Sequence, residues 1–190
     1  MSKTKNKIIN VAKSLFREIS LYKATMSDIA KAAKMSRRTI YTHFKNKEEL
    51  YKYVIEDEIK GINLKLQKAA DSQLPPDRKL KLYILQHFNV IDNLVRNNRY
   101  IRYDFLFNTI RIEHLRKEID RNEIELISGI IREGKEKGIF RVSDPVVFSQ
   151  NLLLMFKSLE QAFILANRKD RNSRTILEYI DLMFYGIIKK

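Results

Sequence analysis

Side chains that can bind anions gather in one short stretch near the N-terminus of this 190-residue chain. Between positions 36 and 47 they are Ser36, Arg37, Arg38, Thr39, Tyr41, Thr42, His43, Lys45 and Lys47. Arginine presents a planar fork of N–H donors, lysine carries a point charge, and hydroxyl groups donate or accept hydrogen bonds. No nucleophile motif and no glycine-rich phosphate loop accompanies this set, so the stretch favours binding over catalysis.

The residues that precede this stretch predict a short helix that ends near Lys34. Its apolar face consists of Met26, Ile29, Ala30 and Ala33, which lie at helical spacing. Ser27 can cap this helix, and so can Thr25, whose hydroxyl could instead reach a phosphate. A second helix is expected over about 36–44, with Ser36 as its N-cap.

The second helix should present the anion-binding side chains on its outer face. Ile40 and Phe44 are four residues apart, so both can pack inward. The side chains that then point outward are Arg38, Tyr41, Thr42 and Lys45. Arg37 leans toward the core by angle, but a long side chain in the first turn can project past the helix end. A short turn between two small helices, the second of them basic, is typical of a helix-turn-helix.

The same stretch resembles the DNA-binding module of the TetR family of bacterial transcriptional regulators. The matching residues are Asp28-Ile29-Ala30, Ala32-Ala33, Ser36, Thr39-Ile40-Tyr41, His43-Phe44 and Lys47-Glu48-Glu49-Leu50, with Ala12, Leu15-Phe16 and Thr25 upstream. The match is without gaps and covers about the first quarter of the chain. The family often has glycine where this chain has Ser20, Lys34 and Arg38. Because Arg38 adds a charge, the base preference of relatives does not carry over.

These observations assign expected roles on DNA. The residues that open the recognition helix and should meet base edges are Arg37, Arg38 and Thr39. The resemblance places Tyr41, His43 and Lys47 against the phosphate backbone. The remaining candidate contacts are Thr25, Ser36, Thr42 and Lys45. Three lysines near the N-terminus, Lys3, Lys5 and Lys7, either touch phosphates or stay in solvent.

The charge distribution agrees with a polyanion-binding head. The net charge is +14, and residues 1–50 hold 12 Lys and Arg against 4 Asp and Glu, a net of +8. Residues 51–190 hold 25 against 19, a net of +6, so the charge density is several-fold higher in the first quarter. The chain has no cysteine, which suits a reducing cytoplasm, and it has no run of apolar residues long enough to span a membrane.

The whole chain reads as all-α, with about nine helices and no strand-like alternation. After the helix-turn-helix, helices are expected over about 46–71, 77–97, 100–109, 113–138, 145–166 and 173–189, preceded by one over about 4–19. Asn46 is the expected N-cap of the 46–71 helix, paired with Glu49. We therefore predict a DNA-binding domain over 1–46 and a helical ligand-binding and dimerisation domain over 47–190.

The second domain suggests two further surfaces. Helices 145–166 and 173–189 carry more apolar surface than one small domain covers, so they are expected to pair with a second copy. The resemblance also implies a small-molecule pocket, for which the candidates are Tyr83, His87, Phe88, Tyr103, Phe107 and Phe156, although each can be plain core. The carboxylates Glu118, Asp120, Glu123 and Glu125 alternate with basic residues and are expected on a solvated, salt-bridged face.

Three function classes follow from these patterns. The leading one is a dimeric, sequence-specific DNA-binding regulator, acting as a repressor on a palindromic operator and released by a small molecule. The second is a basic helical protein that binds anionic membrane surfaces, and the third is an enzyme that reuses the fold. No cofactor or metal is expected, since Glu113-His114 lacks a second ligand at helical spacing.

Overall fold

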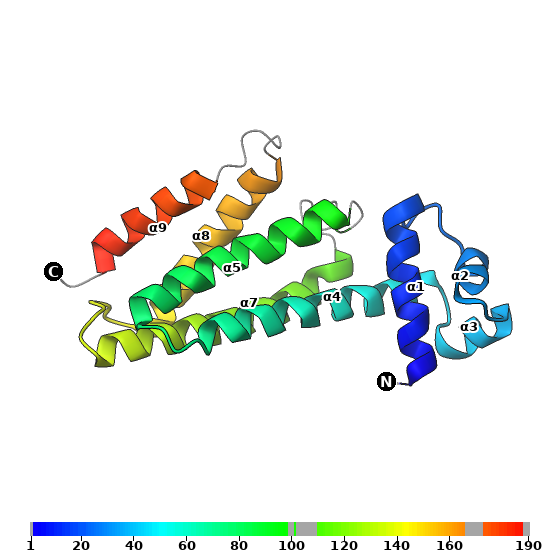
Figure 1. Ribbon diagram of the computed structural model, residues 1–190, viewed down its shortest axis with the longest axis horizontal. Coiled ribbons are helices and arrows are strands. Elements are labelled where there is room, and N and C mark those ends of the chain that lie inside the picture. The colour runs from blue at the N-terminus through cyan, green and yellow to red at the C-terminus, as the bar shows by residue number, and fades with distance from the viewer. Residues whose placement is uncertain (1, 99–100, 102–109, 166–172, 188–190) are drawn as a thin grey trace. The chain divides into compact units, whose positions relative to one another are not determined.

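The computed structural model describes residues 2–98, 101, 110–165 and 173–187, and these form an all-α protein (Figure 1). Its helices are α1 (Lys3–Ile19), α2 (Met26–Ala33), α3 (Arg37–His43), α4 (Lys47–Ala70), α5 (Pro76–Asn97), α7 (Ile110–Glu136), α8 (Pro145–Leu165) and α9 (Ser173–Ile187). The all-α prediction is confirmed, and the predicted helix limits agree with these to within a few residues. The helix expected over 100–109 lies, except for residue 101, outside the described residues.

The helix limits follow from local signals in the sequence. Pro76 and Pro145 are the first residues of α5 and α8, where the missing N–H of proline costs nothing. Asn46 accepts a hydrogen bond from the Glu49 backbone N–H at 2.8 Å, so it caps α4 as predicted. The Glu49 carboxylate accepts from the Lys45 N–H, at 2.6 Å, rather than from Asn46 itself.

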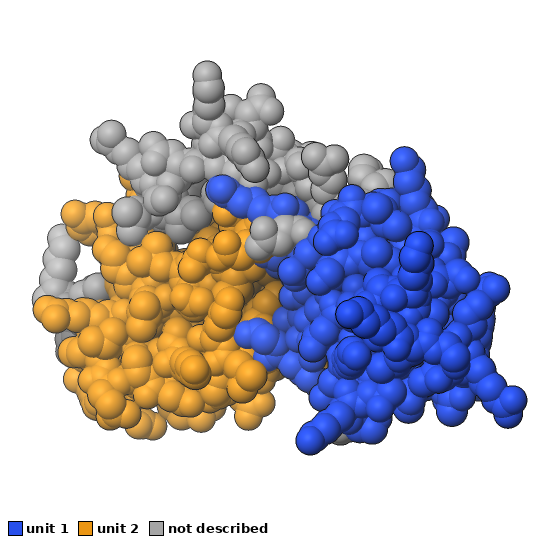
Figure 2. Space-filling model, turned by 45° about the vertical axis from the view of Figure 1, so that its right-hand side comes forward, with its two compact units in different colours: residues 1–61, 94–115 blue, residues 62–93, 116–190 orange. Residues whose placement is uncertain are grey.

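The chain divides into two compact units (Figure 2). Unit 1 consists of residues 1–61 and 94–115, and unit 2 of residues 62–93 and 116–190. In unit 1, α1 buries Ile8, Ala12 and Phe16, and Phe16 meets Tyr51 of α4 edge to face at 6.3 Å. Ile19, at the last turn of α1, is 40% exposed.

Within unit 1, ion pairs tie α1 to α4, and a hydrogen bond ties α1 to Asn98, the residue that follows α5. Arg17 donates through Nη2 to Glu58 Oε1 at 2.7 Å and through Nε to Asn98 Oδ1 at 2.8 Å. Lys13 forms an ion pair with Asp57. The first helix is thereby fixed on the middle of the long α4, which follows the helix-turn-helix.

Unit 2 has an apolar core of its own. Its α5 buries residues on more than one face, among them Leu80, Tyr83, Ile84, Phe88 and Ile91. The turn after α7 is held closely, because Ile139 and Phe140 both donate to the Gly134 carbonyl, at 2.8 and 3.1 Å. Among the helices of the described ranges, none is both long and apolar enough to cross a bilayer.

Candidate nucleic-acid interface

The first helix of the helix-turn-helix is fixed by a capping box at Thr25. The Thr25 hydroxyl accepts from the Asp28 N–H at 3.1 Å and donates to Asp28 Oδ2 at 2.6 Å, and Asp28 accepts from the Thr25 N–H at 2.9 Å. The hydroxyl hydrogen bond, followed by the backbone one, lowers the pKa of Asp28. Thr25 is therefore the N-cap of α2, and the alternative expectation that Ser27 caps it was wrong.

The turn between α2 and α3 uses a left-handed residue without glycine. Lys34 has φ 55° and ψ 48°. Its N–H donates to the Lys31 carbonyl at 3.1 Å, and the Met35 N–H donates to the Ala30 carbonyl at 3.0 Å. This pair of bonds is a Schellman motif, which satisfies the last carbonyls of α2. The motif ends α2 sharply, and α3 starts at Arg37, two residues after Met35.

Ser36 is the N-cap of the recognition helix α3, as predicted. The Ser36 hydroxyl accepts from the Thr39 N–H at 3.0 Å and lies 2.9 Å from the Thr39 hydroxyl. Ile40 is fully buried and Phe44 is 1% exposed, which confirms the predicted inward face. The cap and the two apolar anchors together fix the direction in which α3 presents its other side chains.

The outer face of α3 presents free hydrogen-bond donors. Arg37 and Arg38 are both exposed, and neither guanidinium has a partner within the described ranges. Tyr41 is 48% exposed, whereas the Thr42 hydroxyl donates to the Arg38 carbonyl at 2.9 Å. Two unpaired guanidinium groups in the first turn of a short exposed helix have the donors that guanine O6 and N7 accept.

Lys47 has partners that its sequence position did not indicate. Its ammonium donates to the carbonyls of Leu21 at 2.9 Å, Ala24 at 3.1 Å and Tyr22 at 3.4 Å. A lysine has three N–H donors, and all three point at the turn between α1 and α2. Lys45, in contrast, is exposed and its ammonium has no partner among the described residues.

The N-terminal lysines divide in a similar way. The Lys5 ammonium lies 3.6 Å from the centroid of the Tyr53 ring and 5.3 Å from that of Phe44. This cation–π contact holds the start of α1 against the end of α3 and the start of α4. Lys3 and Lys7 are exposed. The structure thus gives Lys5 a packing role in addition to the two alternatives considered for it.

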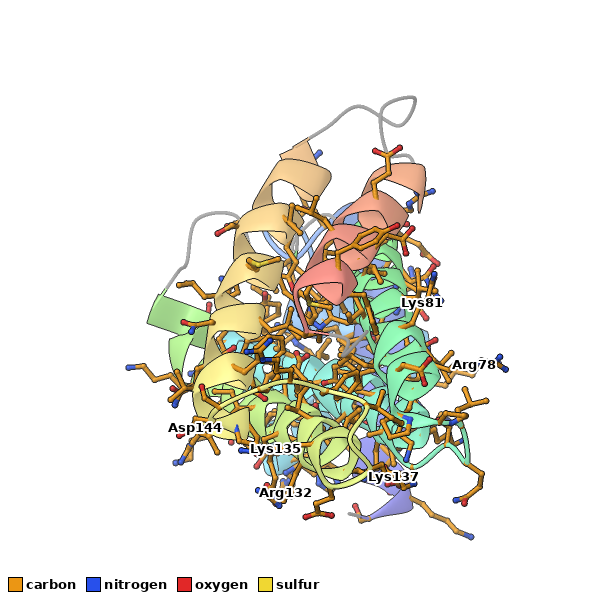
Figure 3. All side chains as sticks on the ribbon, turned by 90° about the vertical axis from the view of Figure 1, so that its left-hand side faces the viewer. Arg78, Lys81, Arg132, Lys135, Lys137 and Asp144 are labelled. Atoms are coloured by element: carbon orange, nitrogen blue, oxygen red, sulfur yellow. The ribbon has the colours of Figure 1, made fainter. Side chains whose placement is uncertain are left out.

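Three lysines of unit 2, Lys79, Lys135 and Lys137, are engaged by carboxylate or carbonyl oxygens. Lys79 and Lys137 each contact Glu133 at 2.7 Å, and their hydrogen bonds lower the pKa of Glu133, with Lys137 contributing most. Lys135 donates to the Ser143 carbonyl at 2.6 Å. Figure 3 shows Arg78 projecting outward from α5. These pairs join α5, α7 and the following loop, whereas the guanidinium groups of α3 remain uncompensated.

Comparison with known proteins identifies this arrangement. The family model described as "Bacterial regulatory proteins, tetR family" matches residues 8–54, which comprise most of α1, all of α2 and α3, and the start of α4. The chain belongs to the TetR family of transcriptional regulators. It is therefore a helix-turn-helix DNA-binding protein and a regulator, not an enzyme.

Relatives of this TetR-family regulator extend beyond the first three helices. An uncharacterised HTH-type regulator, YhgD of Bacillus subtilis, is 24% identical over 82% of this chain and 81% of its own length. The fatty acid metabolism regulator of the same organism is 23% identical over 69% of this chain and 68% of its own. A structure titled as the SmeT–triclosan complex superposes with a TM-score of 0.72 at 18% identity, covering all of this chain and 93% of SmeT. These likenesses support the same fold along the whole chain.

The regulator also has a buried polar network inside unit 2. Its side chains come from three helices: Tyr83 and His87 from α5, Glu123 from α7 and Glu160 from α8. His87 Nδ1 lies 2.7 Å from Glu123 Oε2, and Nε2 lies 2.6 Å from Glu160 Oε1. The Tyr83 hydroxyl donates to Glu123 Oε2 at 3.0 Å. Each of the four side chains is at most 8% exposed.

This network is electrostatically coupled. Burial by itself would lower the pKa of His87, but Glu123, with its charge and its hydrogen bond, and then Glu160 raise that pKa to about 10. Burial and the neighbouring Glu123 also raise the pKa of Tyr83. The prediction that Glu123 lies on a solvated face was wrong, and Glu160 was not singled out at all. Across the described ranges, no group of acidic and histidine side chains fits a metal ion.

A small apolar hollow lies beside this network (lining residues Ile84, Phe88, Leu152, Met155, Phe156, Leu159, Ile180 and Met183). The rings of Phe88 and Phe156 pack against His87, with centroids 5.3 and 4.7 Å away. Four of the predicted pocket residues thus lie together, namely Tyr83, His87, Phe88 and Phe156. Tyr103 and Phe107 lie outside the described residues.

Proposed function

We propose that this TetR-family regulator is a homodimeric repressor that binds a roughly palindromic operator and releases it when a small molecule occupies unit 2. In this proposal residues 1–46 read DNA, and residues 47–190 bind the ligand and the second copy. The observation that carries the proposal is the pair of exposed, unpaired guanidinium groups of Arg37 and Arg38 at the start of α3.

Base reading is assigned to the first turn of α3. Arg37, Arg38 and Thr39 are placed where a recognition helix meets base edges, and each arginine can bind a guanine with two hydrogen bonds. Phosphate contacts are assigned to side chains beside or beyond that turn: Thr25, Ser36, Tyr41, Thr42, His43 and Lys45. Lys47 is assigned an indirect contribution, because its three donors are bound to backbone carbonyls.

The apolar faces of α8 and α9 support a dimer. These helices lie side by side (Figures 1 and 3), and the exposed fractions are 65% for Leu154, 73% for Leu182 and 82% for Tyr185. Scattered exposed apolar residues are ordinary, but a group of them on neighbouring helices marks an association surface. A two-fold dimer would place two α3 helices in successive major grooves about 34–36 Å apart.

Sedimentation at micromolar concentration tests the dimer. We expect a dimer for the natural chain and a monomer for Leu182→Glu, because the substitution buries an unpaired charge at the interface. Leu64→Glu is the matched control, since Leu64 is 64% exposed on α4 and its replacement should leave the dimer intact. A natural chain that sediments as a monomer would contradict the proposal.

The relatives support the parts of the proposal that concern repression and release by a ligand. SmeT is described as the repressor of the Stenotrophomonas maltophilia multidrug efflux pump SmeDEF, and its structure has been determined with triclosan. In the present chain, α4 starts four residues after the recognition helix ends and runs for 24 residues. A ligand that favours one arrangement of this helix can shift the DNA-binding equilibrium only through its differential affinity for the two states.

Operator binding provides the decisive experiment. Fragments of the source genome that the protein retains define the operator, and binding is then measured on operator and scrambled duplexes over a salt series. We expect Arg37→Ala or Arg38→Ala to cost about 1–3 kcal/mol on the operator and to relax the preference at one base pair of each half-site. If both variants lose affinity equally on both duplexes, the arginines bind only phosphates, and specificity must come from Thr39, Tyr41, Thr42 or DNA shape.

A further inference from the structure

One arginine of α1 joins three segments of unit 1. The Arg17 guanidinium donates through Nη2 to Glu58 of α4 at 2.7 Å, and through Nε to Asn98, the residue after α5, at 2.8 Å. Figure 1 shows α1 lying across α4. A guanidinium group has a rigid fork of N–H donors, so one side chain holds two acceptors from different segments at a set angle. Arg17 therefore fixes α1 relative to both α4 and the end of α5.

Both acceptors are held in place by other contacts. Asn98 is buried, and its amide nitrogen donates to the Leu94 carbonyl in the last turn of α5, at 2.8 Å. This hydrogen bond orients the amide group, so that its oxygen faces Arg17. The Glu58 carboxylate is largely covered and also lies 3.5 Å from the Lys13 ammonium. The two acceptors thus define the direction in which the guanidinium must lie.

Lys13, one turn before Arg17, makes a simpler contact. Its ammonium forms an ion pair with Asp57 and lies 3.5 Å from Glu58, so its partners in the described part of the chain are both on α4. Loss of either basic side chain weakens the attachment of α1 to α4. Only loss of Arg17 also releases α1 from the end of α5, so the two residues allow attachment and positioning to be distinguished.

The Arg17 contact connects the helix-turn-helix to two helices that extend beyond unit 1. The borders of unit 1 fall at residues 61 and 94, within α4 and within α5. On the other side, α1 packs against α2, and α2 packs against α3. An angle that is fixed at Arg17 is therefore passed on to α3. In a dimer, this angle determines the separation and the direction of the two recognition helices.

We propose that Arg17 is a positioning residue for operator recognition, which holds α3 in one orientation through Asn98 and Glu58 and so makes the regulator selective for one spacing of the half-sites. The inference rests on the dimeric operator binding proposed above, and it names a residue outside α3 that determines the specificity of that binding. A helix-turn-helix that turns to follow a different spacing breaks the Arg17–Asn98 hydrogen bond. The lost hydrogen bond weakens binding to the operator with the wrong spacing.

Operators that differ only in their central spacing test this selectivity. Each inserted base pair moves the half-sites about 3.4 Å apart and rotates one by about 35° relative to the other. Affinity is measured for the natural spacing and for operators with one base pair inserted or removed, and the ratio of the two affinities gives the selectivity. Arg17→Lys keeps the charge and loses the rigid fork. Because a dimer has two of these charge-assisted hydrogen bonds, we expect this variant to lower the ratio by about tenfold.

Lys13→Met is the matched control, because it weakens the attachment of α1 to α4 and leaves the contact with Asn98 intact. It should lower the stability of the protein without changing the ratio. Asn98→Leu removes the acceptor instead of the donor and should lower the ratio as Arg17→Lys does, and the double variant should lower it no further. An unchanged ratio in Arg17→Lys would overturn the proposal. An equal fall in Lys13→Met would overturn it as well, and so would a natural chain that binds every spacing equally.

A distance measurement without DNA separates this inference from the proposed function. The chain has no cysteine, so spin labels can be attached to cysteines introduced at Ala32 of α2 and Asn93 of α5, which are both exposed. With labelled chain diluted into unlabelled chain, Arg17→Lys should broaden the distribution of distances between the labels, and Lys13→Met should not. A broadened distribution in a protein that binds no duplex contradicts the proposed function alone. An unchanged distribution in a dimer that binds its operator overturns the inference alone.

Discussion

Replacing Lys47 by methionine removes the ammonium and keeps a side chain of similar length. This change tests whether Lys47 stabilises the turn before α2 or binds a DNA phosphate. Lys47→Met removes the donor to the carbonyls of Leu21 and Ala24, at 2.9 and 3.1 Å, and the weaker contact to Tyr22. A hydrogen bond to a charged group contributes about 1.5–3 kcal/mol, and the partial exposure of Lys47 reduces this, so we expect a total loss of about 2 kcal/mol. For a chain of this size that corresponds to a fall of about 4–8 °C in Tm.

For Lys47→Met we also expect a specific effect on the salt dependence of DNA binding. The dependence of the binding constant on salt reports how many phosphates are neutralised, at about 0.9 units of slope per contact. If Lys47 acts by holding the turn that precedes α2, Lys47→Met weakens binding to every duplex but leaves this slope unchanged. Lys45→Met is the matched control, because Lys45 is exposed and its ammonium has no partner within the described residues. It should lower the slope by about two units per dimer while the unfolding free energy changes by less than about 0.5 kcal/mol.

The opposite pattern would refute this reasoning. If Lys47→Met lowers the salt slope as much as Lys45→Met does and leaves Tm unchanged, the ammonium leaves its carbonyl partners and binds a phosphate. That result would support the role that the resemblance to relatives implies. Thermal unfolding and anisotropy titrations at four salt concentrations, on the natural chain and both variants, give both quantities.

Three further predictions concern stability. Gly134→Ala should lower the unfolding free energy by about 1–3 kcal/mol, because a Cβ there would lie 2.1 Å from the Phe140 ring, whereas Gly129→Ala in the same helix meets nothing within 4 Å and should raise it by up to about 1 kcal/mol. Ser20→Gly should raise it by about 1 kcal/mol, because Ser20 has φ 73° and ψ 153°, a conformation almost restricted to glycine. The folded-state pKa of His87 is raised to about 10, so the stabilisation that its protonated form provides is complete below about pH 6.5 and is lost as pH rises to about 10. Over this range the unfolding free energy should fall by at most about 1.4 kcal/mol per pH unit, and His87→Gln should lack this fall. Urea unfolding of each variant gives these free energies, and for His87 it is repeated over pH 6–10. A variant whose unfolding free energy does not change, or changes in the opposite direction, would contradict the corresponding prediction.

The helix-turn-helix could be predicted because its signals are local. Ser36 and Asn46 stand directly before the helices they cap, and the four-residue spacing of Ile40 and Phe44 sets the buried face of α3. Each of these signals acts over fewer than five residues, which is the range that periodicity and capping rules cover. The choice of cap for α2 needed one more local comparison, since only Thr25 has an acid three residues later.

Contacts between distant residues could not be predicted in the same way. The carbonyl partners of Lys47 lie 23–26 residues earlier in the chain, and a carbonyl carries no side-chain signal at all. The alternation of charges along α7 indicated a solvated face, yet Glu123 is 2% exposed. A signal was available, because Glu123 is four residues from both Ile119 and Ile127, which lie on the buried stripe of that helix.

The positions where relatives often have glycine differ in what the backbone requires. Among the described non-glycine residues, Ser20 and Lys34 are the ones with positive φ, at 73° and 55°, so both stand where glycine has an advantage. Arg38 has no such angle and continues the first turn of α3. Glycine at position 38 would therefore only weaken the helix, whereas Arg38 adds a hydrogen-bond donor to the DNA-facing side without backbone strain.

The strain at Ser20 and the contacts of Lys47 meet in one turn. Ser20 starts the turn between α1 and α2, which the Ala24 N–H closes on the Ser20 carbonyl at 3.1 Å, and Lys47 binds the carbonyls of Leu21 and Ala24 within it. If the ammonium offsets the strain, Lys47→Met should cost about 0.5–1 kcal/mol less in a Ser20→Gly background than in the natural chain. The double variant should also regain part of the lost DNA affinity, because the turn sets the start of α2 and through it the direction of α3. Unfolding free energies and operator affinities of the two single variants and the double variant complete the cycle. Strict additivity of both quantities would show that Lys47 does not act through this turn.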